Sequence, residues 1–167
     1  MNDMRWNVLF LCTGNSARSV IAEGLLRSLG GERFNAHSAG SFPTGRINPG
    51  AVPILQSLGL DPGDFRSKSW DEFAGPEAPR IDFIFTVCDN AAGEVCPVWP
   101  GRPLTAHWGV EDPAAVTGTE VEVAAAFRSA ESRLRRRIER LLALSTEVLS
   151  GPDALAHLRA IGMDTTP

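Results

Sequence analysis

The chain lacks the features that mark several large classes of protein. Its 167 residues carry a formal net charge of −4, which does not indicate binding to nucleic acid or to an acidic membrane surface. The apolar run near the N-terminus, residues 6–11, is too short for a signal peptide or a membrane span, and there are no internal repeats. We therefore expect a cytoplasmic protein with a small-molecule partner. A hydrophobic content of 43% is enough for the core of one domain.

Cysteine is also scarce, because the chain has only Cys12, Cys88 and Cys96. A small, odd number of cysteines in an intracellular chain favours thiol chemistry over a structural disulfide framework. There is no Cys-x-x-Cys spacing, and His37 and His107 do not form a metal-ligand motif, so no metal or cofactor is predicted. An alternative for Cys88 and Cys96 is that both are inert buried thiols.

The residues after Cys12 predict an oxyanion-binding loop. Cys12 directly follows the apolar run and opens the sequence Cys-Thr-Gly-Asn-Ser-Ala-Arg-Ser, residues 12–19, which leads into a helical pattern. Small and polar residues allow backbone N–H groups to surround a tetrahedral anion, and Arg18 offers a planar fork to two of its oxygens. The predicted oxyanion ligands are Thr13, Gly14, Asn15, Ser16, Ala17 and Arg18.

The same environment makes Cys12 a candidate nucleophile. The positive end of the helix and Arg18 predict a pKa for Cys12 below that of an ordinary thiol. We expect the Ser19 hydroxyl to donate to the thiolate. The alternative is a small core cysteine that happens to follow a strand.

Strand and helix patterns alternate along the chain. Apolar runs predict strands over residues 6–11, 34–39, 81–87 and 103–106. Helical spacing and end signals predict helices over 17–29, 48–58 and 119–149, with a short helix or turn over 66–73. This order predicts an α/β fold with a parallel sheet and right-handed crossovers.

The last part of the chain is expected to form an extension. We place one domain over residues 1–150 and a C-terminal extension over 151–167, with a short amphipathic helix through Leu155, Leu158 and Ile161. The arginines between 133 and 140 are expected on a solvated helix face, because glutamates are interspersed and pairs such as Glu131 with Arg135 are available.

Three distant positions are predicted to share one site. Loops that follow parallel strands lie along one edge of a sheet, and Cys12, Cys88 and Asp112 each follow a different strand. Asp112 would protonate the oxygen that leaves an attacked oxyanion, although Asp-Pro also suits a helix N-cap, and the two roles are compatible. Seven residues separate Cys88 from Cys96, so this segment must fold back if the two are to act as a resolving pair.

Over residues 5–149 the chain resembles the arsenate reductases of the low-molecular-weight tyrosine phosphatase superfamily. The first motif is shared by phosphatases and reductases, whereas the later cysteines and the His-Trp-Gly segment favour a reductase. The resemblance implies a three-layer fold with a four-stranded parallel sheet of strand order 2-1-3-4. It rests on residues 12–19, Ala22-Glu23-Gly24, Ser38-Ala39-Gly40, Val87-Cys88-Asp89, Cys96-Pro97 and His107-Trp108-Gly109 through Asp112-Pro113-Ala114.

The resemblance also implies a mechanism. Cys12 attacks arsenate, which Arg18 and the loop amides hold, while Asp112 protonates the departing oxygen. Cys88 then attacks Cys12 and releases arsenite, and Cys96 attacks Cys88 to leave a Cys88–Cys96 disulfide for thioredoxin, glutaredoxin or a low-molecular-weight thiol to reduce. Phosphate and sulfate would compete for the loop.

Two departures from the family pattern limit this transfer. Many members have a further cysteine where this chain has Ala17, and the spacing from Cys88 to Cys96 is one residue longer than in the thioredoxin-coupled type, so the reductant stays open. Some members hold potassium with residues that correspond to Asn15, Glu23 and Ser38, but here Lys68 stands near the position of a further aspartate ligand. Two alternative functions remain, a protein tyrosine phosphatase and a non-catalytic oxyanion-binding protein.

Overall fold

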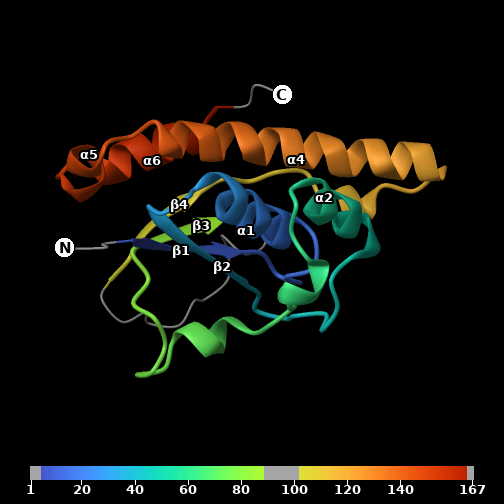
Figure 1. Cartoon of the computed structure of the whole chain (residues 1–167), viewed down its shortest axis with the longest axis horizontal. Helices are drawn as coiled ribbons and strands as arrows, with labels where there is room; N and C mark the ends of the chain where they lie inside the picture. The colour runs from blue at the N-terminus through green and yellow to red at the C-terminus, as the bar shows by residue number, and fades with distance from the viewer. Residues whose placement is uncertain (1–4, 89–101, 165–167) are drawn as a thin grey trace.

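The predicted parallel sheet is present in the computed structural model, which describes residues 5–88 and 102–164 (Figure 1). Its strands run in the order β2-β1-β3-β4, and every neighbouring pair is parallel. This confirms the fold class and the strand order that the family resemblance implied. The strands are β1 (Trp6–Leu11), β2 (Phe34–Ala39), β3 (Phe83–Thr86) and β4 (Leu104–His107).

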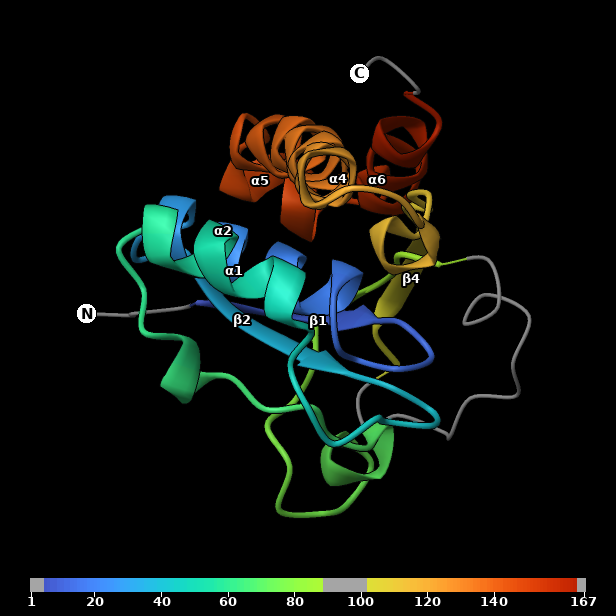
Figure 2. The same ribbon diagram turned by 90° about the vertical axis from the view of Figure 1, so that its right-hand side faces the viewer.

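Both faces of the sheet are covered. Helices α1 (Arg18–Leu29), α2 (Val52–Ser57) and α4 (Glu120–Leu142) lie on one side, and the segment with the short 3₁₀ helix η3 (Trp70–Phe73) lies on the other (Figures 1 and 2). Side chains of β1 alternate between two apolar clusters, with Val8 and Phe10 in one and Leu9 and Leu11 in the other. The continuous apolar run in the sequence therefore reflects a strand that is buried on both faces.

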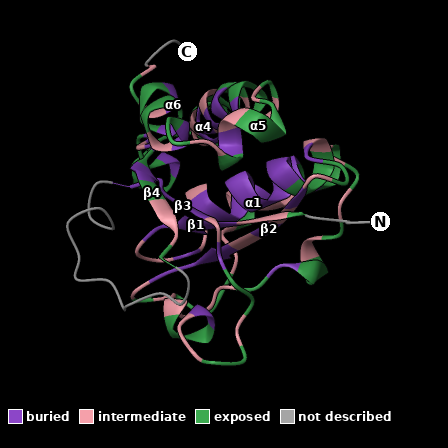
Figure 3. Cartoon of the chain, turned by 90° about the vertical axis from the view of Figure 1, so that its left-hand side faces the viewer, coloured by how far each residue is buried: buried purple, intermediate pink, exposed green. Residues whose placement is uncertain are grey.

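Helix α1 directly follows the predicted oxyanion-binding loop and is the most deeply buried helix. Eight consecutive residues, Ser19 to Leu26, are buried. Figure 3 shows this burial along α1, in contrast to the exposed outer surface of α5 (Thr146–Ser150). A helix enclosed on most sides holds its first turn in a fixed place, which suits a loop that must be preformed.

The prediction of a single helix over 119–149 is wrong at one point, because α4 ends at Leu142 and α5 starts at Thr146. Ser145 caps α5, and its side chain accepts a hydrogen bond from the N–H of Val148 at 3.2 Å. The break rotates the chain, so that Leu149 rather than Val148 is buried. Similarly, the helix predicted over 48–58 begins as the 3₁₀ turn η1 (Pro49–Ala51) before α2.

The arginines of α4 do not all lie on a solvated face, and this expectation is corrected. Arg135 does pair with Glu131 at 3.2 Å, as the spacing predicted. Arg137, however, is only 5% exposed and donates to backbone carbonyls beyond β4. Arg137 lies three residues after Leu134 and four before Leu141, so it falls on the apolar stripe of the helix.

The chain continues after α5 into helix α6 (Ala154–Gly162), which packs on β4 and α4 (Figure 2). Ala154, Leu158 and Ile161 are its buried residues, whereas Leu155 is half-buried. Among residues 5–88 and 102–164, no helix combines the length and apolarity needed to cross a membrane.

His37 on β2 generates a prediction about stability and pH. Burial, together with Arg27 and Lys68, lowers the pKa of His37 to about 4, and its Nε2 is buried without a hydrogen-bond partner. The unfolded chain binds this proton near pH 6.5, so stability is lost as the pH falls from about 6.5 towards about 4. In His37→Phe the ring keeps its packing on Phe73 but cannot ionise.

We expect the free energy of unfolding of the wild type to fall by about 2 kcal/mol more than that of His37→Phe between pH 7 and pH 4.5. Urea unfolding at the two pH values measures this difference. Equal losses in the two proteins would show that His37 is not held neutral in the folded state.

Candidate active site

The loop between β1 and α1 has the geometry of an anion-binding turn. Its carbonyls point outwards, and those of Thr13, Gly14 and Ser16 accept hydrogen bonds from backbone amides within residues 42–48 at 2.9–3.0 Å. Asn15 has a φ of 45°, in the left-handed region, and such a change of hand in successive residues directs N–H groups into one concavity. The loop therefore has a conformation that suits the predicted binding of an oxyanion.

Close backbone packing fixes this loop from behind. Gly40 follows β2, and a Cβ atom there would collide with the carbonyl oxygens of Cys12 and Thr13. Only glycine allows the two segments to approach this closely. This explains why the Ser-Ala-Gly sequence at 38–40 accompanies the loop motif.

The Asn15 side chain ties the loop to its surroundings and is fully buried. Its amide nitrogen donates to Ser19 Oγ at 2.8 Å and to Ser38 Oγ at 3.0 Å, while its oxygen accepts from the backbone N–H of Lys68 at 2.9 Å. These hydrogen bonds all go to neighbouring protein groups, so the Asn15 side chain holds the loop in place. A role of the Ser19 hydroxyl towards the Cys12 thiolate stays a prediction.

An ammonium group completes this polar network. Ser38 donates to Glu23 at 2.5 Å, and Lys68 Nζ lies 3.9 Å from the same carboxylate oxygen. Arg27 forms a second ion pair with Glu23. Burial raises the pKa of Glu23, and Lys68, Ser38 and Arg27 oppose that rise. The Lys68 ammonium thus lies beside Glu23, one of the residues for which the family resemblance implied a cation site.

The second cysteine lies beside the first. Cys88 follows β3 and is 3% exposed, and Cys12 is 6% exposed, so both thiols are buried. The N–H of Thr13 donates to Cys88 Sγ at 3.4 Å, and the two cysteine side chains are hydrogen-bonded to each other. The structure therefore brings together two residues that sequence topology placed at one edge. Cys96 lies outside the described residues.

The expected low pKa of Cys12 is not found in this arrangement. The hydrogen bond with Cys88 and burial raise the pKa of the Cys12 thiol, and these effects outweigh Arg18 and the N–H of Gly14, which lower it. A charge in a buried site next to a second sulfur is costly, and this effect was not visible in the loop motif alone. This arrangement therefore favours the neutral thiol of Cys12, hydrogen-bonded to Cys88, over the Cys12 thiolate.

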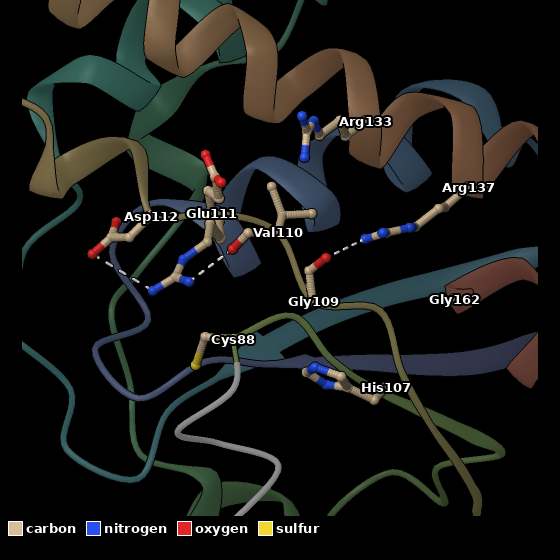
Figure 4. A pocket seen from close by; sticks show the side chains of 10 residues that line it. Cys88, His107, Gly109, Val110, Glu111, Asp112, Arg133, Arg137 and Gly162 are labelled. Carbon is tan, nitrogen blue, oxygen red and sulfur yellow. Dashed lines mark hydrogen bonds and ion pairs between the residues drawn. The ribbon is translucent and has the colours of Figure 1, made fainter. Parts of the chain in front are cut away.

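Arg18 and Asp112 lie side by side on the wall of a cavity of about 500 Å³ (Figure 4). Arg18 donates to the carbonyl of Val110 at 2.9 Å and lies 3.6 Å from Asp112 Oδ2. Asp112 Oδ1 accepts from the N–H of Ala114 at 3.0 Å and so caps the turn η4 (Pro113–Ala115). The capping role of Asp112 and a position facing the loop do coexist. Cys88 and His107 also line the cavity.

Two arginines of α4 reach this cavity and were missed from the sequence. Arg133 and Arg137 line the wall opposite Cys88 (Figure 4). Arg137 donates to the carbonyls of Trp108 at 2.6 Å and Gly109 at 2.8 Å, at the start of the segment that we call the acid loop, residues 108–112. The available signal was the position of Arg137 on the apolar stripe of α4. No group of three or more metal-ligating side chains occurs within residues 5–88 and 102–164.

Comparison with known proteins identifies the class. The sequence model of the family described as low molecular weight phosphotyrosine protein phosphatase matches residues 7–149. This match spans the sheet, the loop, both described thiols and Asp112. The chain belongs to this family.

Within the family, the chain is similar to arsenate reductases. It is 37% identical to that of Halalkalibacterium halodurans, over 79% of this chain and 91% of the relative. It is 36% identical to that of Bacillus subtilis over the same shares of the two chains.

Solved structures agree with these relatives. The arsenate reductase of Archaeoglobus fulgidus is 27% identical with a TM-score of 0.64, over 82% of this chain and 99% of that one. A structure described as an arsenate reductase in the phosphate binding state is 25% identical with a TM-score of 0.62, over 83% and 97%. The resemblance seen in the sequence is therefore confirmed.

The contact between the two thiols generates a prediction about Cys12. In Cys88→Ala the neighbouring sulfur is absent, while Arg18 and the loop amides remain, so the pKa of Cys12 should fall. We expect Cys12 to react with iodoacetamide about tenfold faster at pH 7 than in the wild type. Peptide mass spectrometry resolves alkylation at Cys12 from that at Cys96. An unchanged pH profile for Cys12 would show that Cys88 does not control its ionisation.

Proposed function

We propose that the protein reduces arsenate to arsenite, with Cys12 as the nucleophile and Cys88 as the thiol that completes the reduction. The observation that carries this proposal is the contact between two buried cysteine side chains, one of which begins the predicted oxyanion loop. Hydrolysis of a cysteine intermediate by water needs one thiol, whereas reduction needs a second thiol within reach of the first. The names of the similar proteins support the same reaction.

In the first step, arsenate occupies the loop and replaces Asp112 as the partner of Arg18. The oxyanion ligands are the backbone amides from Thr13 to Arg18 and the Arg18 guanidinium. Cys12 reacts as the thiolate and forms a sulfur–arsenic bond, an arsenic–oxygen bond breaks, and Asp112 delivers the proton with which that oxygen leaves as water. Arsenic stays in the +5 state in this adduct.

In the second step, the Cys88 thiolate attacks the sulfur of Cys12. A disulfide forms, the sulfur–arsenic bond breaks, and its electron pair goes to arsenic, which leaves as arsenite in the +3 state. The two thiols supply the two electrons. Cys96 then attacks Cys88, which restores Cys12 and leaves a Cys88–Cys96 disulfide.

An external thiol must reduce that disulfide. We place the reaction in the cytoplasm, where thioredoxin, glutaredoxin or a low-molecular-weight thiol keeps cysteines reduced. Phosphate and sulfate have the same tetrahedral shape as arsenate, so both should compete for the loop. Hydrolysis of aryl phosphates is the second candidate activity, because Cys12, Arg18 and Asp112 are the parts that a phosphatase of this family would use.

The direct experiment supplies the purified protein with arsenate, NADPH and either a thioredoxin or a glutaredoxin system. We expect arsenate-dependent oxidation of NADPH with one arsenite formed per NADPH. An enzyme that hydrolyses aryl phosphates but makes no arsenite with either system would be a phosphatase. A protein that binds arsenate without either reaction would be an oxyanion-binding protein.

Cysteine variants separate the steps. Cys12→Ser should lose even the first turnover, because no adduct forms. Cys88→Ser and Cys96→Ser should lose multiple-turnover arsenate reduction, since the first variant cannot attack the Cys12 adduct and the second cannot pass the disulfide on. Hydrolysis of an aryl phosphate serves as the control and should survive in both later variants, because it uses only the loop and the acid. Full steady-state reduction by Cys88→Ser would exclude the relay.

Asp112→Asn tests the acid. Asparagine can still accept the hydrogen bond from the N–H of Ala114, so the cap and the fold should remain. It cannot deliver a proton, so adduct formation should slow by about 10²–10⁴-fold. Rapid-quench measurement of the first turnover gives this rate, and a melting curve controls for folding. An unchanged rate would leave Asp112 with the capping role alone.

A further inference from the structure

Helix α6 lies beyond residue 149, where the family match ends, yet it packs on the strand that leads to the acid (Figure 1). The indole of Trp108, which begins the acid loop, is fully buried, and its Nε1 donates to the carbonyl of Leu158 in α6 at 2.9 Å. A face of this indole stacks on Phe85 of β3 with ring centroids 3.7 Å apart. Trp108 is therefore held between the sheet and α6.

Gly162 at the end of α6 allows this approach. A Cβ atom at this position would collide with the carbonyl oxygen of His107 and lie 2.8 Å from Cδ1 of Trp108. No side chain larger than hydrogen fits unless α6 moves away from β4. The end of α6 is thus seated directly on the backbone from which the acid loop begins.

The guanidinium of Arg137, on α4, binds both the acid loop and the residue that lies two positions after the end of α6. Its NH1 donates to the carbonyls of Trp108 and Gly109, and its NH2 donates to the carbonyl of Asp164 at 3.4 Å. The Asp164 carboxylate, in turn, lies 3.0 Å from Arg140 and 3.3 Å from Arg136. Arg137 thereby links α4, the residues after α6 and the acid loop.

The acid loop is short, so its start controls its end. Val110 follows the two carbonyls that Arg137 holds, and its own carbonyl accepts from Arg18. Asp112 comes two residues later and faces Arg18 at 3.6 Å. Two residues span at most about 7 Å, so displacement of residues 108–110 must move Asp112.

We propose that Arg137 and residues 151–164 form a positioning element that holds Asp112 towards the bound oxyanion. This inference rests on the proposed function, because it assigns Asp112 the role of acid. Arg137 is a positioning residue, since it acts through the acid loop and not on the substrate. The C-terminal segment is then part of the working enzyme, even though the family match does not reach it.

Two variants test the proposal from opposite sides of the loop. Arg137→Gln removes the guanidinium, and Gly162→Ala forces α6 away from β4. The matched controls are Arg135→Gln, which removes another arginine of α4 that pairs with Glu131, and Gly75→Ala, where a Cβ meets no atom within 4 Å. Circular dichroism identifies a temperature at which all four variants are folded.

Amide hydrogen exchange reports the position of the loop without any turnover. We expect residues 108–115 to exchange about tenfold faster in Arg137→Gln and Gly162→Ala than in the two controls, while β1 and α1 stay protected. Equal exchange in the variants and their controls would overturn the proposal.

Kinetics then test whether this position matters for the acid. Phenyl phosphate has a poor leaving group that needs a proton, whereas p-nitrophenyl phosphate has a good one that does not. Both test variants should slow phenyl phosphate hydrolysis and the first turnover of arsenate by about 10–100-fold, with little effect on p-nitrophenyl phosphate. Both controls should resemble the wild type.

The decisive result comes from combining variants. In an Asp112→Asn background, Arg137→Gln should cause no further loss, because the residue through which it acts is already inactive. An independent further loss of 10-fold or so, or an equal slowing of both aryl phosphates, would overturn the proposal. A wild type that hydrolyses phenyl phosphate but makes no arsenite would contradict the proposed function alone.

Discussion

The meeting of the two thiols depends on the parallel pairing of β1 with β3. Leu11 lies opposite Thr86, and the hydrogen bonds continue one residue beyond β3. The chain therefore leaves both strands at the same level, and Cys12 and Cys88 follow within two residues. A shift of one residue in this pairing would turn each side chain of β3 to the other face and separate the sulfur atoms. The oxyanion loop, the acid loop and α6 are all arranged around this one register.

Burial of Cys12 and Cys88 has two opposite effects on the proposed reaction. It raises the pKa of Cys12 and so works against the first attack, which the loop amides and Arg18 must promote. The same burial keeps Cys88 beside Cys12, so the second nucleophile of the proposed relay is in place when the adduct forms. A binding loop of this phosphatase family can thus serve the proposed reduction, because a second thiol lies next to the first.

Sequence patterns predicted the strands, the oxyanion loop and the edge at which Cys12, Cys88 and Asp112 meet. These features follow from local rules, namely apolar runs, spacing around Cys12 and the geometry of parallel sheets. The strand order came from the family resemblance. The buried Arg137 and the raised pKa of Cys12 were missed, because each depends on contacts between residues far apart in the chain, whereas the break at residues 143–145 was missed although Ser145 is a local capping signal. The spacing of Arg137 from Leu134 and Leu141 indicates burial, but the carbonyl groups that it binds are known only from the structure.

The central claim is that Cys88 completes the reduction by attacking Cys12. The most direct measurement is peptide mapping of the Cys96→Ser variant after a single turnover with arsenate, because this variant cannot pass the disulfide on. The account predicts one Cys12–Cys88 disulfide for each arsenite released. Arsenite release without that disulfide, or a Cys12–Cys88 disulfide that forms equally well without arsenate, would contradict it.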